Sequence, residues 1–165
     1  GQQIEDNLGD GSRWGLTIAY SSESTALETA GGIANALNLL GDSPFLVVNG
    51  DVFTDVNFAN LKLQPPNLAH LVMVDNPPQH PRGDFAIKAG KLAESADLQY
   101  TFSGVGVYHP QLFSGVKQGE AAKLAPLLKQ AMSQGLVTAE HHQGVWHDIG
   151  TPERLAALDE AISQP

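Results

Sequence analysis

Residues 44–51, with the sequence PFLVVNGD, constrain the fold more than any other stretch of the chain. The apolar run after Pro44 predicts a strand that is buried on both faces of a parallel sheet. Ligands of open α/β sheets bind beyond the carboxyl ends of the strands, which is where Asp51 stands. This carboxylate is therefore a candidate ligand for a metal ion over a bound phosphate. The stretch leaves a second interpretation open, in which Asp51 is a turn residue that caps the next element.

A second carboxylate, Asp148, also ends an apolar run, at residues 145–147, and stands just before Gly150. Carboxylates from two strand ends can converge on one hard cation at the edge of a sheet. The pattern therefore predicts either a shared metal site or two unrelated turn residues.

Length, charge and cysteine content exclude several classes of protein. The 165 residues are enough for one domain with a core, and we expect residues 1–165 to form a single domain. A net charge of −9 without clustered cations argues against nucleic acid as a partner. The chain has no cysteine, so it has no disulfide, thiolate zinc site or cysteine nucleophile. No membrane span or signal-peptide pattern is visible, which predicts a cytoplasmic protein without a membrane partner.

The pattern of apolar and turn residues predicts alternating strands and helices at the front and hairpins after Pro77, hence one α/β domain with a mixed sheet. We expect Gly9 to end a first helix, Thr29 to cap the second and Thr151 the last. The expected helices are 1–8, 29–40, 58–63, 112–113, 124–132 and 151–162, and the expected strands are 16–20, 45–49, 70–74, 84–87, 91–92, 101–108, 136–142 and 145–149.

Two further features allow both a structural and a functional interpretation. The pair Gly31-Gly32 at a helix start would let backbone amides approach an anionic ligand, or would let the helix pack closely on its neighbour. Asp84 follows Arg82-Gly83 and precedes an apolar strand, so it could bind a sugar hydroxyl or end a turn.

Five short motifs in order carry a resemblance to a known family. The segments 27–32, 49–51, 83–85, 102–104 and 148–153 resemble those of the sugar-1-phosphate nucleotidyltransferases, over essentially the whole chain. The resemblance implies a Rossmann-like nucleotidyltransferase fold, that of the nucleotide-diphospho-sugar transferases. It implies that Asp51 and Asp148 are the catalytic pair and hold Mg²⁺. It implies nucleotide contacts from Glu28, Thr29, Ala30, Gly31 and Gly50, and substrate contacts from Asn49, Asp84 and Gly104.

The reaction implied by the resemblance joins a nucleoside triphosphate to a sugar-1-phosphate and releases pyrophosphate. UTP and N-acetylmuramate-1-phosphate are the expected substrates, in peptidoglycan recycling. Mannose-1-phosphate with GTP, or glucose-1-phosphate with dTTP, is the alternative within the class. A regulatory module that binds a nucleotide-sugar without turnover is the alternative outside it.

The sequence departs from the family pattern at two points. The family's first strand and its Gly-rich loop with Arg and Lys are not matched and would precede Gly1, so we expect this chain alone to be an N-terminally incomplete domain without activity, the larger part of an enzyme. The Glu-Lys-Pro motif that binds the sugar phosphate in many relatives is also missing. Lys88 or Lys91 could replace it, although both read more simply as surface lysines of a hairpin.

Overall fold

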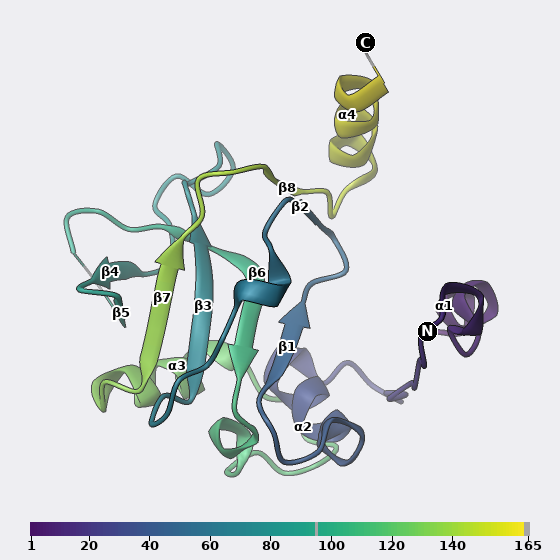
Figure 1. The fold of residues 1–165 in the computed structure, drawn as a ribbon, viewed down its shortest axis with the longest axis horizontal. Helices are drawn as coiled ribbons and strands as arrows, with labels where there is room; N and C mark the ends of the chain where they lie inside the picture. The colour runs from purple at the N-terminus through teal and green to yellow at the C-terminus, as the bar shows by residue number, and fades with distance from the viewer. Residues whose placement is uncertain (95, 164–165) are drawn as a thin grey trace.

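A six-stranded mixed sheet forms the centre of the protein, seen in a computed structural model that describes residues 1–94 and 96–163 (Figure 1). Its strand order is β1-β6-β3-β7-β5-β4. Strands β3 and β7 are parallel, and the other neighbours are antiparallel. The predicted α/β fold with a mixed sheet is confirmed. The strands are β1 (Phe45–Val48), β3 (Ala69–Val74), β4 (Ala86–Lys88), β5 (Lys91–Ala93), β6 (Thr101–Tyr108) and β7 (Val137–His141).

The main core lies between one face of this sheet and the helices α2 (Glu28–Leu40), α3 (Leu124–Ser133) and η3 (Pro110–Phe113). Side chains alternate along a strand, so Leu71 and Met73 of β3 enter this core while Val72 points to the opposite face. There Val72 clusters with Val56 and Val105, and Leu61, the residue after the short helix η2 (Phe58–Asn60), packs against this cluster. The central strands are therefore buried on both faces, and this packing holds the residues at their carboxyl ends in position.

A separate two-stranded ribbon joins β2 (Val52–Thr54) to β8 (Trp146–Asp148), which are antiparallel. The indole Nε1 of Trp146 donates a hydrogen bond to the Ser103 carbonyl oxygen at 2.9 Å. This bond attaches the ribbon to β6 of the main sheet, so strands that are distant in sequence meet at one edge.

Two helical segments project from the sheet in Figure 1, namely α1 (Gln2–Leu8) with η1 (Ser12–Trp14), and α4 (Pro152–Ser163). Helix α1 has no buried residue, and α4 buries Leu158. In the described part of the chain no helix is both long and apolar enough to cross a bilayer. That residues 1–165 form a single domain stays a prediction.

Most predicted elements are present, including the Gly9 helix stop, the hairpin around Gly90 and the Thr151 cap of α4. The prediction of a strand at 45–49 buried on both faces of a parallel sheet is wrong. Strand β1 pairs with β6 alone among the described strands, and antiparallel, so Leu46 and Val48 remain exposed.

Three local predictions are also wrong. Residues 16–20 form no strand, because this segment folds back on the preceding turn, where the Ile18 amide donates to Asp10. Thr29 is not the cap of α2, since the helix begins at Glu28 after Leu27. The helix expected at 58–63 is a single 3₁₀ turn, in which the Asn57 side chain accepts a hydrogen bond from the Ala59 amide.

Candidate active site

The two predicted metal ligands meet at the end of the ribbon. Asp148 is opposite Val52, the residue after Asp51, and the Ile149 amide donates to the Asp51 carbonyl oxygen at 2.8 Å. A Cβ placed on Gly150 would lie 2.7 Å from Asp51 Oδ2 and 3.2 Å from Asp148 Oδ1. Arg154 Nη2 would lie 3.3 Å from the same Cβ, so the two carboxylates and this guanidinium gather around the Gly150 backbone.

The start of α4 holds the Asp148 carboxylate in place. Asp148 Oδ1 accepts a hydrogen bond from the Gly150 amide at 3.0 Å and forms an ion pair with Arg154 Nη2 at 3.0 Å. Thr151 Oγ1 accepts from the Arg154 amide and so caps the helix. The pKa of Glu153 is lowered, chiefly because its own backbone amide at the helix start bonds to the carboxylate. The short turn from β8 to α4 thus positions one ligand by backbone and side chain together.

A cavity of about 310 Å³ opens in front of the two carboxylates. It is also lined by Asn49, Asp84 and Gly104, which were predicted to contact the substrate. Gly104 has φ +80°, and an added Cβ there would lie 2.8 Å from Nδ2 of the Asn49 side chain. A side chain at position 104 would therefore be strained and would displace Asn49 from the cavity wall.

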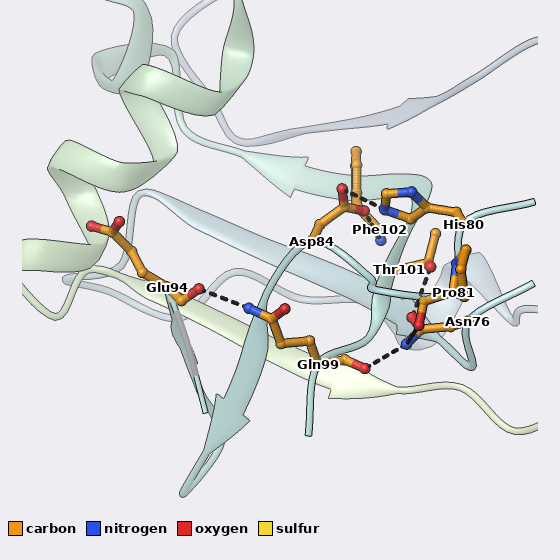
Figure 2. A network of polar contacts seen from close by, with 8 residues as sticks. All are labelled: Asn76, His80, Pro81, Asp84, Glu94, Gln99, Thr101 and Phe102. Atoms are coloured by element: carbon orange, nitrogen blue, oxygen red, sulfur yellow. Dashed lines mark hydrogen bonds and ion pairs between the residues drawn. The ribbon is translucent and has the colours of Figure 1, made fainter. Parts of the chain in front are cut away.

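Asp84 lies in the cavity wall, and both of its carboxylate oxygens make polar contacts, which Figure 2 shows. One oxygen lies 3.1 Å from His80 Nε2, and the other accepts the Phe102 amide at 2.8 Å. These two contacts fix the carboxylate between the loop after β3 and strand β6. The interpretation of Asp84 as a mere turn residue does not account for the Phe102 contact, and its sugar-binding role stays a prediction.

A second cavity of about 400 Å³ shares Asn49, Asp84 and Phe102 with the first. Glu28 and Thr29, both predicted to contact the nucleotide, lie in its wall. The backbone of Glu28 is left-handed, with φ +59°, a conformation that costs a residue with a Cβ about 1–2 kcal/mol. Strained residues are frequent at ligand sites, which agrees with the predicted role without testing it.

The remaining predicted nucleotide contacts lie outside both cavity walls. The amides of Ala30 and Gly31 donate to the Ala122 carbonyl oxygen, at 3.0 and 3.1 Å. A Cβ on Gly31 would lie 2.5 Å from the Glu120 carbonyl oxygen, so close packing explains this glycine. Gly50 is exposed. The nucleotide roles of these three residues stay predictions.

The donor set at Gly150 suits magnesium held jointly by protein and substrate. The described residues contain no group of three or more His, Cys, Asp or Glu side chains able to hold a metal. Mg²⁺ is commonly bound by one or two carboxylates, with substrate phosphates and water completing its octahedron. Asp51 and Asp148 provide two carboxylates in the wall of one cavity, so they fit this arrangement.

Sequence reasoning missed several residues of the site, above all Arg154, Trp146 and His80. Arg154 left a signal, because a cation in the first turn of a helix opposes the helix dipole and needs a local partner. That partner is Asp148. Lys91, considered as a phosphate ligand, instead donates to Asn67 at 2.6 Å and to the Gly135 carbonyl at 2.8 Å.

Sequence comparison now assigns the class of protein. A model of the nucleotidyl transferase family matches residues 1–164, and the chain belongs to that family. It is 49% identical to the N-acetylmuramate alpha-1-phosphate uridylyltransferase of Neisseria meningitidis serogroup B, over 94% of this chain and 71% of that protein. It is 28% identical to the mannose-1-phosphate guanylyltransferase of Mycobacterium tuberculosis, over 91% of this chain and 45% of that protein. The family resemblance predicted from the motifs is confirmed.

Solved structures agree on the fold. A Bacillus anthracis protein crystallised with sucrose has a TM-score of 0.78 and 18% identity, covering 99% of this chain and 72% of its own. HddC from Yersinia pseudotuberculosis in complex with GMP-PN has a TM-score of 0.76 and 19% identity, covering 98% and 74%. The predicted nucleotidyltransferase fold is therefore confirmed.

Proposed function

We propose that this protein transfers a uridylyl group from UTP to N-acetylmuramate-1-phosphate, with Mg²⁺, giving a nucleotide-sugar and pyrophosphate. The observation that carries the proposal is that Asp51 and Asp148 lie close together beside Gly150, in the wall of one cavity. The 49% identity to a relative with this named activity supports the choice of substrates. UTP is a cytoplasmic nucleotide and the acceptor belongs to cell-wall recycling, so the proposed location is the cytoplasm.

The proposed chemistry is one displacement at the α-phosphorus of UTP. A phosphate oxygen of the sugar-1-phosphate forms the new P–O bond, and the bond to the β-phosphate oxygen breaks, releasing pyrophosphate. Both substrates are anionic, and Asp51, Asp84 and Asp148 line the site, so catalysis depends on charge neutralisation and positioning. A bound Mg²⁺ would supply that neutralisation and orient the phosphates.

The residues of the chain hold and orient the reacting groups in this proposal. Asp51 and Asp148 hold the cation, with Asp148 kept in place by Arg154. Asn49 and Asp84 contact the sugar, and Gly104 leaves room for Asn49 to do so. The nucleotide side is assigned to Glu28, Thr29, Ala30, Gly31 and Gly50.

Pyrophosphate release by the intact protein tests the proposal, with four nucleoside triphosphates against several sugar-1-phosphates. We expect the highest kcat/KM for UTP with N-acetylmuramate-1-phosphate. A preference for GTP with mannose-1-phosphate, or for dTTP with glucose-1-phosphate, would replace these substrates by the alternatives within the class. Nucleotide-sugar binding without release from any pair would favour the regulatory module.

A further inference from the structure

The β2–β8 ribbon holds the two proposed metal ligands at its end, yet it has little pairing of its own. Its strands have three residues each, and among the described strands they pair only with each other. A lone pair of strands is at best marginally stable in water. A slip of one residue would move Asp148 away from its position opposite Val52, and so away from Asp51. The placement of the two carboxylates therefore depends on contacts that hold the ribbon from outside.

One such contact lies at the end of the ribbon away from the carboxylates. Asp55 directly follows β2, and its Oδ1 lies 2.7 Å from Nε2 of His142, the residue directly after β7. This is the shortest contact between a histidine and a carboxylate in the described part of the chain. Beside it, the Asp55 amide and Thr54 Oγ1 both donate to the Val145 carbonyl oxygen, at 3.1 and 2.8 Å. The Asp55–His142 pair therefore closes the far end of the ribbon.

The same pair connects the ribbon to the central sheet. The His142 amide donates to the carbonyl oxygen of Met73, a completely buried residue of β3, at 2.8 Å. A Cβ on Gly144 would lie 2.5 Å from Asp55 Oδ1 and 2.8 Å from His142 Cε1. The turn that leads from β7 to β8 thus leaves room for the contact because residue 144 has no side chain. A histidine held by the core strand in this way fixes the residue at which β2 ends.

We infer that Asp55 and His142 are positioning residues, which keep the ribbon in the register that places Asp51 beside Asp148. The inference rests on the proposed function of those two carboxylates. Neither Asp55 nor His142 lines the cavity at the carboxylates, so the pair acts through the ribbon and not on a ligand. The other end of the ribbon is closed by the Ile149 amide, which donates to the Asp51 carbonyl oxygen. Holding both ends keeps the paired strands from slipping.

A second histidine–carboxylate pair provides a matched control. His70 Nε2 lies 3.2 Å from Glu140 Oε2, and this pair joins β3 to β7 without contacting the ribbon. The exposed fractions of the side chains are close in the two pairs, at 14% for His70 and 17% for His142, and at 50% for Glu140 and 56% for Asp55. Replacing either carboxylate by alanine removes the acidic partner of a largely buried histidine. Only Asp55→Ala should loosen the ribbon.

NMR spectroscopy tests the structural part of the inference without substrate or metal. The chain has two tryptophans, and the indole N–H of Trp146 bonds the ribbon to Ser103. In Asp55→Ala we expect the Trp146 indole signal to shift and its hydrogen exchange to become about tenfold faster, the effect of losing a hydrogen bond to a charged group. The signal of the exposed Trp14 is the internal reference, and Glu140→Ala should leave both signals unchanged. An unchanged Trp146 signal in Asp55→Ala would overturn the inference.

Mn²⁺ affinity in the presence of UTP tests the positioning role itself. Asp55→Ala and His142→Ala should each lower this affinity about tenfold, as for contacts that orient metal ligands. The double variant should bind about as weakly as either single variant, because one contact joins the two residues. His142→Gln keeps a side-chain N–H donor and should recover part of the affinity. Glu140→Ala should bind Mn²⁺ like the wild type.

The two measurements separate the possible failures. Wild-type Mn²⁺ affinity in Asp55→Ala, together with a changed Trp146 signal, would show that the pair stabilises the ribbon without positioning the carboxylates, and would overturn the inference. If Asp55→Ala does not fold, Asp55→Asn, which removes the charge and keeps the size, should give smaller changes in the same direction. Absence of pyrophosphate release by the wild type with any substrate pair would instead overturn the proposed function.

Discussion

Strand β3 and the β2–β8 ribbon are built in opposite ways. Leu71, Val72 and Met73 of β3 are completely buried between β6 and β7. In the ribbon, two strands of three residues pair only with each other among the described strands, and Phe53 is 40% exposed. The two carboxylates proposed for catalysis lie at the end of the ribbon. If the proposed roles are correct, stability depends mainly on β3 and chemistry on the ribbon end, so substitutions in each should affect different measurements.

The largest effect is expected at the ribbon end. Asp51→Asn or Asp148→Asn should each lower turnover at least about a hundredfold, the loss of one charge-stabilising contact in the transition state. The melting temperature should change little, because both side chains are at the surface of a cavity. Steady-state pyrophosphate release and thermal unfolding measure the two quantities. Asp159→Asn, on the exposed side of α4, is the matched control, and near wild-type rates in both site variants would contradict the assignment.

The sheet should respond in the opposite way. Leu71→Ala leaves a cavity in a fully buried strand and should lower the free energy of unfolding by about 2–5 kcal/mol. Turnover per folded molecule should stay close to wild type. Phe53→Ala in the ribbon should cost clearly less stability, since that side chain is already exposed to water. Denaturant unfolding measures the loss of unfolding free energy in both variants. A larger loss for Phe53→Ala than for Leu71→Ala would contradict the comparison.

A smaller effect is expected at Gly150, where the ribbon turns into α4. The added methyl of Gly150→Ala would lie 2.7 Å from Asp51 Oδ2, so the carboxylates must separate. We expect affinity for a divalent cation to fall about tenfold, the lower end for disturbed ligand orientation. Calorimetry with Mg²⁺ and UTP measures it. Gly115→Ala, which meets no atom within 4 Å, is the control, and unchanged affinity in Gly150→Ala would argue against convergence at this point.

The smallest effect concerns the core next to the edge strand. The Tyr108 hydroxyl is buried without a partner among the described residues, and burial raises the pKa of this group. Tyr108→Phe removes the unpaired hydroxyl and keeps the ring, so stability should rise by about 1 kcal/mol. Thermal unfolding at neutral pH checks this. A lower melting temperature would mean that the hydroxyl has a partner, such as a buried water.

The sequence predicted the central strands well, because β3 and β6 are long apolar runs with clear turn signals at their ends. It failed at β1, where the apolar residues suggested a central strand although the pairing leaves one edge open. Burial on both faces cannot be read from composition alone, since an edge strand can carry the same residues. The prediction of a strand at residues 16–20 was wrong for a related reason. Alternating apolar and polar residues form a strand only where a partner strand is available.

The site was predictable in part. Asp148 ends β8 as expected, whereas Asp51 lies in the turn before β2, and the pairing of β2 with β8, which the sequence did not predict, brings the two residues together. Arg154 was missed because its role depends on the turn between β8 and α4, which aims a helix residue back at Asp148. Gly31 shows that one residue type can have two explanations. A glycine at this position suits a ligand-binding loop, and it equally suits close packing against the Glu120 backbone.

Direct measurement of cation binding tests the central claim, that Asp51 and Asp148 jointly hold one divalent ion. Mn²⁺ binding in the presence of UTP can be followed by electron paramagnetic resonance for wild-type protein, each Asn variant and the double variant. We predict that each single variant weakens binding at least about tenfold. The double variant should bind Mn²⁺ only slightly more weakly than the weaker-binding single variant. Two ligands of one ion are coupled, so losing the second costs little once the first is gone. Wild-type affinity in either single variant, or independent additive losses, would contradict the account.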